Sequence, residues 1–112
     1  MQDPSLDPDL SAKIQSLLGG SKVVLFMKGT KTFPQCGFSA KVVGILREVG
    51  VDFQAHNILL DPDLREGLKR YSNWPTYPQL YVDGKLVGGC DIVTDLYESG
   101  QLAKMLQTAP SA

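Results

Sequence analysis

The chain of 112 residues has little cysteine, no excess of charge of one sign and no long hydrophobic run. Its two cysteines, Cys36 and Cys90, are too few for a disulfide-stapled scaffold or for the four ligands of a structural zinc site. The 11 Lys and Arg residues nearly cancel the 12 Asp and Glu residues, which argues against a binder of nucleic acid or of acidic membranes. No apolar stretch approaches the roughly 18–20 residues of a membrane span. The cysteines must therefore act singly, as one bridge, or with groups from outside the chain.

What is present suffices for one globular domain. Hydrophobic residues make up 43% of the chain and charged residues 21%, a composition that excludes a disordered protein. Residues 1–9 are acidic and rich in turn-forming proline, unlike a signal or transit peptide, which has a basic start. We expect a flexible lead-in over residues 1–9, one domain over 10–107 and a tail over 108–112. The chain is then cytosolic, or a mature or trimmed form, in a reducing compartment.

Hydrophobic periodicity predicts alternating helices and strands. Helices are expected over residues 10–18, 37–49, 91–98 and 101–107, and from Asp61, where Asp as N-cap precedes Pro at the first helical position. Strands are expected over residues 23–27, 51–57, 79–82 and 85–87. The pair Asp83-Gly84 joins the last two strands as a hairpin.

This order of elements favours one fold class. Strand–helix–strand units imply parallel pairing, and the hairpin adds an antiparallel edge. We therefore predict an α/β protein of the thioredoxin-like fold, with a four-stranded mixed sheet flanked by about five helices.

The chemistry is centred on Cys36-Gly37-Phe38-Ser39, where a loop leaves the first strand and enters a helix. A thiol there meets unpaired backbone N–H groups and the positive end of the helix dipole, and both lower its pKa. Lys28, at the end of the strand, adds a second positive influence. We predict a reactive thiolate at Cys36; the alternative is a small apolar residue near a turn.

Ser39 stands where a dithiol protein has its second cysteine, so a mixed disulfide on Cys36 must be resolved by another thiol. That thiol is a free one such as glutathione, or Cys90. Alternatively Cys36 is a metal ligand from which Ser39 is excluded.

At this point a family resemblance becomes specific. It rests on Lys28, the loop Gly29-Thr30-Lys31-Thr32-Phe33-Pro34-Gln35, the Cys-Gly-Phe-Ser sequence, Trp74-Pro75-Thr76-Tyr77-Pro78-Gln79-Leu80 and Gly88-Gly89-Cys90-Asp91. The chain resembles the single-domain monothiol glutaredoxins of the C-G-F-S class from about residue 10 to residue 106, and most of all their plastid and cyanobacterial branch. Dithiol glutaredoxins have a shorter loop before the cysteine and lack the Trp-Pro pair.

The resemblance implies a thioredoxin fold, bound glutathione and a bridging [2Fe–2S] cluster. Such a cluster takes four ligands, usually thiolates. Cys36 and one glutathione thiol give two, so two chains give four, and a homodimer would share the cluster. Iron–sulfur acceptor or scaffold proteins are the implied partners. The chloroplast stroma is the favoured compartment, with cytoplasm or mitochondrial matrix as alternatives.

The resemblance also implies a glutathione groove. Lys28 and Arg65 would pair with the glycyl carboxylate, assisted by Lys69. Tyr77, before a cis Pro78, would pair through its backbone with the cysteinyl part. The alternative for Arg65, Lys69 and likewise for Arg70 is a solvated helix face.

The second glycine-rich motif is expected to hold the other end of glutathione. Gly89 and its neighbour Gly88 let the backbone come close to a ligand. The N–H groups of Cys90 and Asp91 and the Asp91 carboxylate would hold the γ-glutamyl end, with Asp91 also as N-cap. Cys90 is either a small buried residue or a resolving thiol for Cys36.

Three aromatic residues have separate expectations. Trp74 is either a core aromatic or a wall of the groove beside the cluster. Phe38 is expected near the exposed sulfur. His56, the only histidine, is not expected to be a ligand.

Three functions follow. The leading one is an iron–sulfur binding and transfer protein. The second is a glutathione-dependent oxidoreductase that removes glutathione from protein thiols through Cys36 alone. The third is an adaptor whose groove binds partner proteins, with the cluster as sensor.

Overall fold

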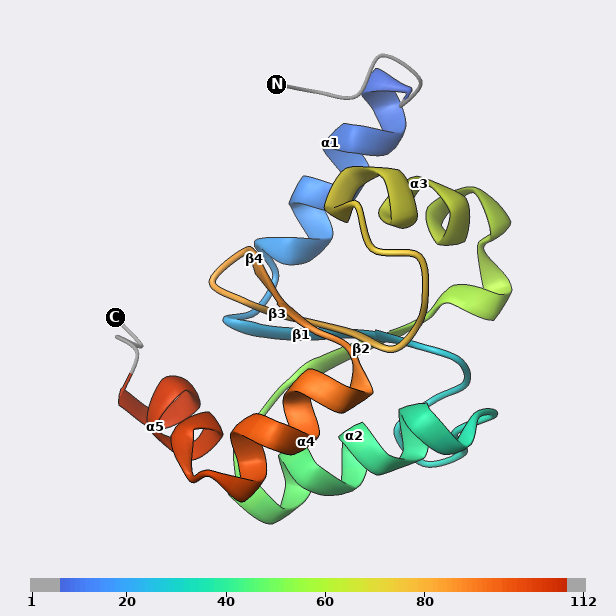
Figure 1. Ribbon diagram of the computed structural model, residues 1–112. Helices are drawn as coiled ribbons and strands as arrows, with labels where there is room; N and C mark the ends of the chain where they lie inside the picture. The colour runs from blue at the N-terminus through green and yellow to red at the C-terminus, as the bar shows by residue number, and fades with distance from the viewer. Residues whose placement is uncertain (1–6, 109–112) are drawn as a thin grey trace.

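The computed structural model describes residues 7–108, which fold into five α-helices, four strands and one 3-10 turn. The helices are α1 (Pro8–Leu18), α2 (Gly37–Val49), α3 (Pro62–Ser72), α4 (Cys90–Glu98) and α5 (Gln101–Thr108). The strands are β1 (Val23–Met27), β2 (Gln54–Asn57), β3 (Gln79–Val82) and β4 (Lys85–Gly88). The 3-10 turn η1 (Ile58–Leu60) joins β2 to α3 and was not predicted. The predicted order of helices and strands is confirmed (Figure 1).

The helix starts follow from local capping. In α3, the Asp61 carboxylate accepts a hydrogen bond from the Leu64 N–H at 3.1 Å, and Pro62 opens the helix as predicted. Asp7 caps α1 by accepting from the Asp9 N–H at 2.9 Å, so this helix begins two residues before Leu10. The rest of the predicted lead-in (residues 1–6) and the predicted tail from residue 109 lie outside the described residues.

The sheet has the strand order β2-β1-β3-β4. β1 and β2 are parallel, as expected for the unit β1-α2-β2, and β3 and β4 form the predicted antiparallel hairpin at the edge. The prediction of parallel pairing is wrong for the second strand–helix–strand unit. β3 instead pairs antiparallel with β1, Phe26 facing Gln79 and Val23 facing Val82. The reason is that the chain after α3 returns, through residues 73–78, to the edge of the sheet where β2 ended.

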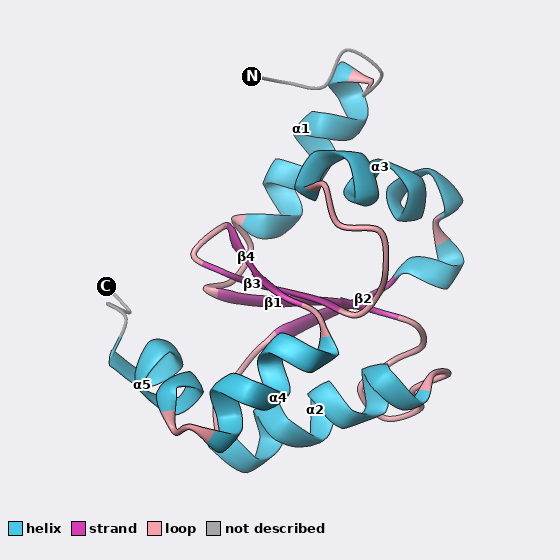
Figure 2. Cartoon of the chain, in the orientation of Figure 1, coloured by secondary structure: helices cyan, strands magenta, loops and turns pink. Residues whose placement is uncertain are grey.

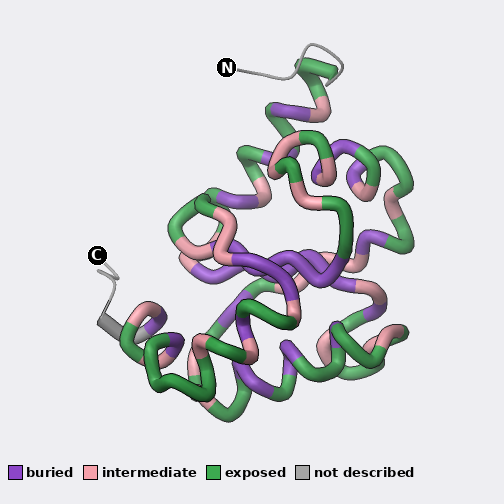
Figure 3. The backbone as a smooth tube through the Cα atoms, viewed as in Figure 1, coloured by how far each residue is buried: buried purple, intermediate pink, exposed green. Residues whose placement is uncertain are grey.

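Two hydrophobic cores lie on opposite faces of the sheet, which makes the thioredoxin-like three-layer arrangement that was predicted. Successive side chains of β1 point to opposite faces, and all five are buried. On one face, Val24 and Phe26 pack with residues of α1 and α3. On the other, Leu25 and Met27 pack with residues of α2, α4 and α5. Figure 3 shows the mainly buried strands β1 and β3, in purple, between the two helical layers.

This topology brings three segments to one edge of the sheet. The parallel strands β1 and β2 end there, and the antiparallel β3 begins there. The loops that follow β1 and precede β3 consequently meet at this edge, at the right in Figure 2. Within residues 7–108, no helix has the length and apolar character needed to cross a membrane.

Candidate functional site

Cys36 is the N-cap of α2, at the edge where the three segments meet. The pKa of its thiol is lowered, chiefly by the polar influence of the Ser39 backbone N–H in the first turn of α2. The backbone N–H of Phe38, the charge of Lys28 and the Ser39 hydroxyl act in the same direction, and partial burial opposes them. These are the helix N-terminus and the lysine that the sequence indicated. The structure therefore provides the conditions for the predicted thiolate.

Ser39 is buried directly behind this thiol. Its side chain has no exposed surface, and its hydroxyl oxygen accepts a hydrogen bond from the Lys28 N–H at 3.1 Å. The same hydroxyl also contributes to the lowered pKa of Cys36. One hydroxyl thus links the end of β1 to the first turn of α2.

The loop between β1 and α2 has a regular internal structure. Gly29 and Pro34 form an antiparallel bridge, and the Gln35 N–H donates to the Lys28 carbonyl at 2.8 Å. The Asn57 carboxamide oxygen accepts from the Gly29 N–H at 2.9 Å and from the Leu59 N–H at 3.0 Å. Asn57 therefore ties this loop to η1, a contact between segments far apart in the chain.

A groove of about 570 Å³ opens beside Cys36. All the predicted site residues except one line it, namely Lys28, Cys36, Arg65, Tyr77, Gly89, Cys90 and Asp91. Pro78 is not among the lining residues, but its bond to Tyr77 is cis, as the resemblance implied. The volume lies within the range of about 300–1,000 Å³ typical of small-ligand sites.

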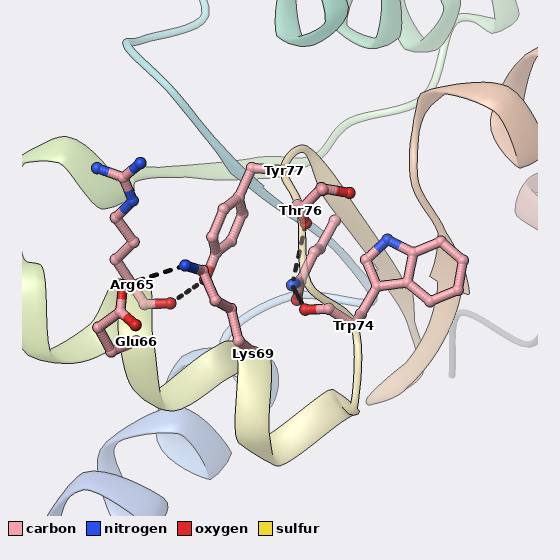
Figure 4. A network of polar contacts seen from close by, with 7 residues as sticks. Arg65, Glu66, Lys69, Trp74, Thr76 and Tyr77 are labelled. Atoms are coloured by element: carbon pink, nitrogen blue, oxygen red, sulfur yellow. Dashed lines mark hydrogen bonds and ion pairs between the residues drawn. The ribbon is translucent and has the colours of Figure 1, made fainter.

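Basic residues from two elements surround the groove. Lys28 follows β1, whereas Arg65 and Lys69 lie on α3 and face the groove rather than bulk solvent alone. Lys69 pairs with Glu66, whose carboxylate oxygen lies 3.1 Å from the ammonium nitrogen (Figure 4). Arg70 lies elsewhere, beside a second depression between α1 and α3. Lys28 and Arg65 are therefore the best-placed cations for an anionic ligand.

Two buried donors among the lining side chains have no hydrogen-bond partner, Arg65 Nε and Trp74 Nε1. Buried N–H groups are nearly always paired in folded proteins. A ligand rich in carboxylate and carbonyl oxygens fits a groove with such donors. Trp74 lies in the groove lining, so the interpretation as a wall of the groove agrees with its position.

The segment before β3 is held to α3. The Tyr77 hydroxyl donates to the Arg65 carbonyl at 2.6 Å, and the backbone N–H of Trp74 donates to the Lys69 carbonyl at 3.1 Å. Burial raises the pKa of Tyr77, so its hydroxyl remains a donor at neutral pH. Figure 4 shows the Tyr77 ring reaching back to the backbone of Arg65.

The predicted N-cap of α4 is wrong. The helix begins at Cys90 with Gly89 as its N-cap, so Asp91 stands inside the first turn. No side chain caps this helix, and the Asp91 carboxylate faces the positive end of its dipole instead. The approach of the glycine backbone to a ligand stays a prediction, but the space at Gly89 is restricted. A Cβ atom on Gly89 would lie 3.2 Å from the Pro78 carbonyl oxygen and from Trp74 Nε1, so a side chain there would crowd the groove.

The remaining predicted residues take different places. Cys90 is a free, half-buried thiol in the groove, and its sulfur lies 4.0 Å from the Thr94 hydroxyl. Phe38 is 63% exposed and lines the groove beside Cys36. His56 lies on β2, stacked on Phe26 with the ring centroids 5.4 Å apart, and is not among the groove residues.

Sequence reasoning missed several contributors. Pro75, Thr76 and Ile92 also line the groove. The first two belong to the motif around Trp74, whose spacing could have indicated them. Asn57 and Gln79 support the loops through hydrogen bonds, and no local pattern marks such contacts.

The fold and the site together define a thioredoxin-fold protein with the Cys36 thiol, whose pKa is lowered, at a helix N-terminus beside a basic groove. The glutaredoxin family model matches residues 23–87. A chloroplastic monothiol glutaredoxin of rice is 55% identical over 104 residues, which cover 93% of this chain and 62% of the rice protein. A monothiol glutaredoxin of Synechocystis is 50% identical over 93% of this chain and 97% of its own length. A probable monothiol glutaredoxin of Rickettsia typhi is 60% identical over 84% and 85%.

Solved structures of glutaredoxins share the fold of this chain. A reduced apo glutaredoxin of poplar superposes with a TM-score of 0.78 at 52% identity, over 88% of this chain and 91% of that chain. A buckwheat glutaredoxin–glutathione complex superposes with a TM-score of 0.78 at 25% identity, over 89% of each chain. The chain belongs to the monothiol glutaredoxins. Its matches among plastid and cyanobacterial proteins confirm the predicted branch, and this chain spans less than two thirds of the rice relative's length.

Proposed function

We propose that this protein binds glutathione in the groove and, as a homodimer, carries a [2Fe–2S] cluster that it transfers to acceptor or scaffold proteins. The observation that carries the proposal is the position of Cys36. It is a single activated thiol at the mouth of a basic groove, and Ser39 takes the place of a second thiol.

The glutathione proposal rests on matching charges and hydrogen-bond partners. Lys28 and Arg65 supply the cations that a carboxylate needs. The Tyr77 backbone offers a peptide partner, and Asp91 offers an anion for the ammonium group at the other end. The buckwheat relative was solved as a glutathione complex, and its fold is shared by this chain.

The cluster proposal rests on the number of thiolates. A [2Fe–2S] cluster needs four ligands, and one chain with one glutathione supplies two. A second chain completes the set. In this assembly half of the ligands are small molecules, so we expect the cluster to be exchangeable cargo. The chain's own task is to hold the Cys36 sulfur as thiolate and to keep the glutathione thiol beside it.

The test is anaerobic reconstitution with ferrous iron, sulfide and glutathione, followed by absorption spectroscopy and size-exclusion chromatography. We expect a coloured dimer that requires both Cys36 and glutathione. Cys36→Ser should abolish it, whereas the matched control Cys90→Ser should retain it. Rapid removal of glutathione from a protein thiol through Cys36, with no cluster formed, would instead establish the oxidoreductase. Partner binding with neither activity would establish the adaptor.

The compartment is also a proposal. Relatives occur in chloroplasts, in a cyanobacterium and in yeast mitochondria. We propose the chloroplast stroma, on the resemblance to the plastid branch. Fluorescence of the tagged full-length protein in its own cells tests it.

A further inference from the structure

Gln79, the first residue of β3, is a polar side chain with no exposed surface. Burying an amide without partners costs free energy, so a buried glutamine is retained where each of its polar atoms is paired. Gln79 is not among the residues that line the groove. The partners of its amide nitrogen, however, belong to residues 74–77, which we call the groove wall.

The Gln79 amide nitrogen donates twice into the groove wall. Its N–H groups donate to the Trp74 carbonyl at 3.2 Å and to the Thr76 carbonyl at 3.3 Å. Trp74 and Thr76 are labelled in Figure 4. The carbonyl oxygen of the Gln79 side chain accepts from the Tyr81 hydroxyl at 2.9 Å. The Ser72 hydroxyl lies 3.4 Å from this oxygen. Only this orientation of the amide places donors against carbonyls and the acceptor against hydroxyls.

The Tyr81 hydroxyl, which donates to the amide oxygen, keeps its proton at neutral pH. Burial raises the pKa of Tyr81 to about 12, so its hydroxyl keeps the proton that it donates to Gln79. Tyr81 is itself buried in the core between the sheet and α1 and α3. The oxygen of the Gln79 amide is therefore bound in the core, and its nitrogen is bound to the wall.

The groove wall needs such support because its sequence limits backbone pairing. Pro75 provides no N–H, and Pro78, which follows the wall, provides none either. The wall is held to α3 by the Tyr77 hydroxyl and the backbone N–H of Trp74. Gln79 adds the attachment to the sheet, through the two carbonyls that flank Pro75.

We propose that Gln79 is a positioning residue that orients the groove wall and thereby sets the affinity for glutathione. This inference rests on the proposed function, since glutathione is the ligand of the wall. The side chain acts through Trp74 and the backbone of Thr76 and Tyr77, without touching the ligand.

The test compares Gln79→Met with the wild-type chain. Methionine has a similar length but no donor, so the Trp74 and Thr76 carbonyls lose their partner. We expect the glutathione Kd, from anaerobic titration calorimetry, to rise about tenfold, the scale of two lost hydrogen bonds that hold the wall. The alkylation pKa of Cys36 without glutathione should not change, because its donors belong to α2. Emission of Trp74, the only tryptophan, should shift to longer wavelength.

Two further variants separate positioning from general stability. Tyr81→Phe removes the hydrogen bond to the amide oxygen, but the two wall carbonyls still fix the direction of the amide donors. It should therefore lower the melting temperature while the glutathione Kd stays unchanged. Gln79→Glu keeps the shape and the acceptor for Tyr81 but lacks the amide donors. It should weaken glutathione binding as Gln79→Met does. It replaces Gln79→Met in the test if the methionine variant does not fold.

The outcomes are distinct. A folded Gln79 variant with wild-type glutathione Kd and wild-type Trp74 emission overturns the inference. So does a Tyr81→Phe variant that loses affinity as much as Gln79→Met. If the wild-type chain binds no glutathione, the proposed function fails, and unchanged Trp74 emission in Gln79→Met would then overturn the positioning role by itself.

Discussion

Ser39 shows how one residue can determine the chemistry of its neighbour. A hydroxyl at this position removes the second thiol, so Cys36 cannot close a disulfide within its own motif. The structure adds a positive role, because the buried hydroxyl accepts from the Lys28 N–H and contributes to the lowered pKa of Cys36. A cysteine three residues before a serine is a weak pattern. Its placement at the start of α2 is what makes it chemically meaningful.

A prediction at this scale concerns the protonation of Cys36. In a Cys90→Ser background, which leaves one thiol to alkylate, the rate of iodoacetamide alkylation should reach half its maximum below the pH of a free thiol, about 8.5. The rate should fall as pH drops through the lowered pKa, because the thiolate becomes protonated. Ser39→Ala removes one of the stabilising donors and should shift this midpoint to higher pH.

Two results would contradict the assignment. One is a wild-type midpoint at or above the free-thiol value. The other is a Ser39→Ala midpoint identical to that of the parent, which would mean that the hydroxyl does not influence the pKa of the thiol in solution.

At the scale of the element, the loop over residues 28–35 is a compact turn closed on itself. Gly29 is central to it, with a φ of 94° that favours glycine. A Cβ atom there would lie 2.5 Å from the Gln35 backbone nitrogen and 2.6 Å from the Phe33 carbonyl oxygen. Both neighbours are backbone atoms that cannot swing away. The loop that delivers the chain to Cys36 therefore depends on the absence of a side chain at this position.

The corresponding prediction uses two glycine-to-alanine changes. Gly29→Ala should lower the free energy of unfolding by at least about 2 kcal/mol, from backbone strain and the clash. Gly44→Ala is the matched control, because Gly44 lies inside α2 and a Cβ there would meet nothing within 4 Å. It should raise the free energy of unfolding by up to about 1 kcal/mol. Urea denaturation measures both, and a neutral Gly29→Ala would show that the loop has another conformation in solution.

At the scale of the whole molecule, β1 joins the two cores. Val24 and Phe26 belong to the layer of α1 and α3, and Leu25 and Met27 to the layer of α2, α4 and α5. Because alternate residues of one strand serve both layers, loss of packing on one face disturbs the other. The molecule is therefore expected to unfold as one unit.

Leu25→Ala tests this expectation. Leu25 has no exposed surface, and its truncation should cost about 2–5 kcal/mol. Trp74 emission reports on the groove, and far-UV circular dichroism reports on all helices. The two denaturation curves should coincide in the wild-type chain and shift together in the variant. Separate midpoints would show that the two layers unfold independently.

Much of the fold was predictable because its signals are local. The five-residue apolar run of β1, the Asp61-Pro62 start of α3 and the Asp83-Gly84 turn each carry their own physical cause within a few residues. Where two nearby residues compete for one role, local reasoning was less exact. Asp91 was predicted to cap α4, but the helix extends one residue further back and Gly89 takes that place.

The sequence by itself determined which chemistry is available: one thiol in a helix-start motif, a lysine at a strand end and a serine in place of a second cysteine. The sequence also indicated the protein family, through motifs spread over nearly the whole chain. Only the tertiary structure decided where these groups meet. β3 runs antiparallel to β1 and starts at the edge where β1 and β2 end, which brings residues 28, 36, 65, 77 and 90 around one groove. The direction of β3 depends on pairing between residues more than fifty positions apart, and a local pattern cannot specify such a contact.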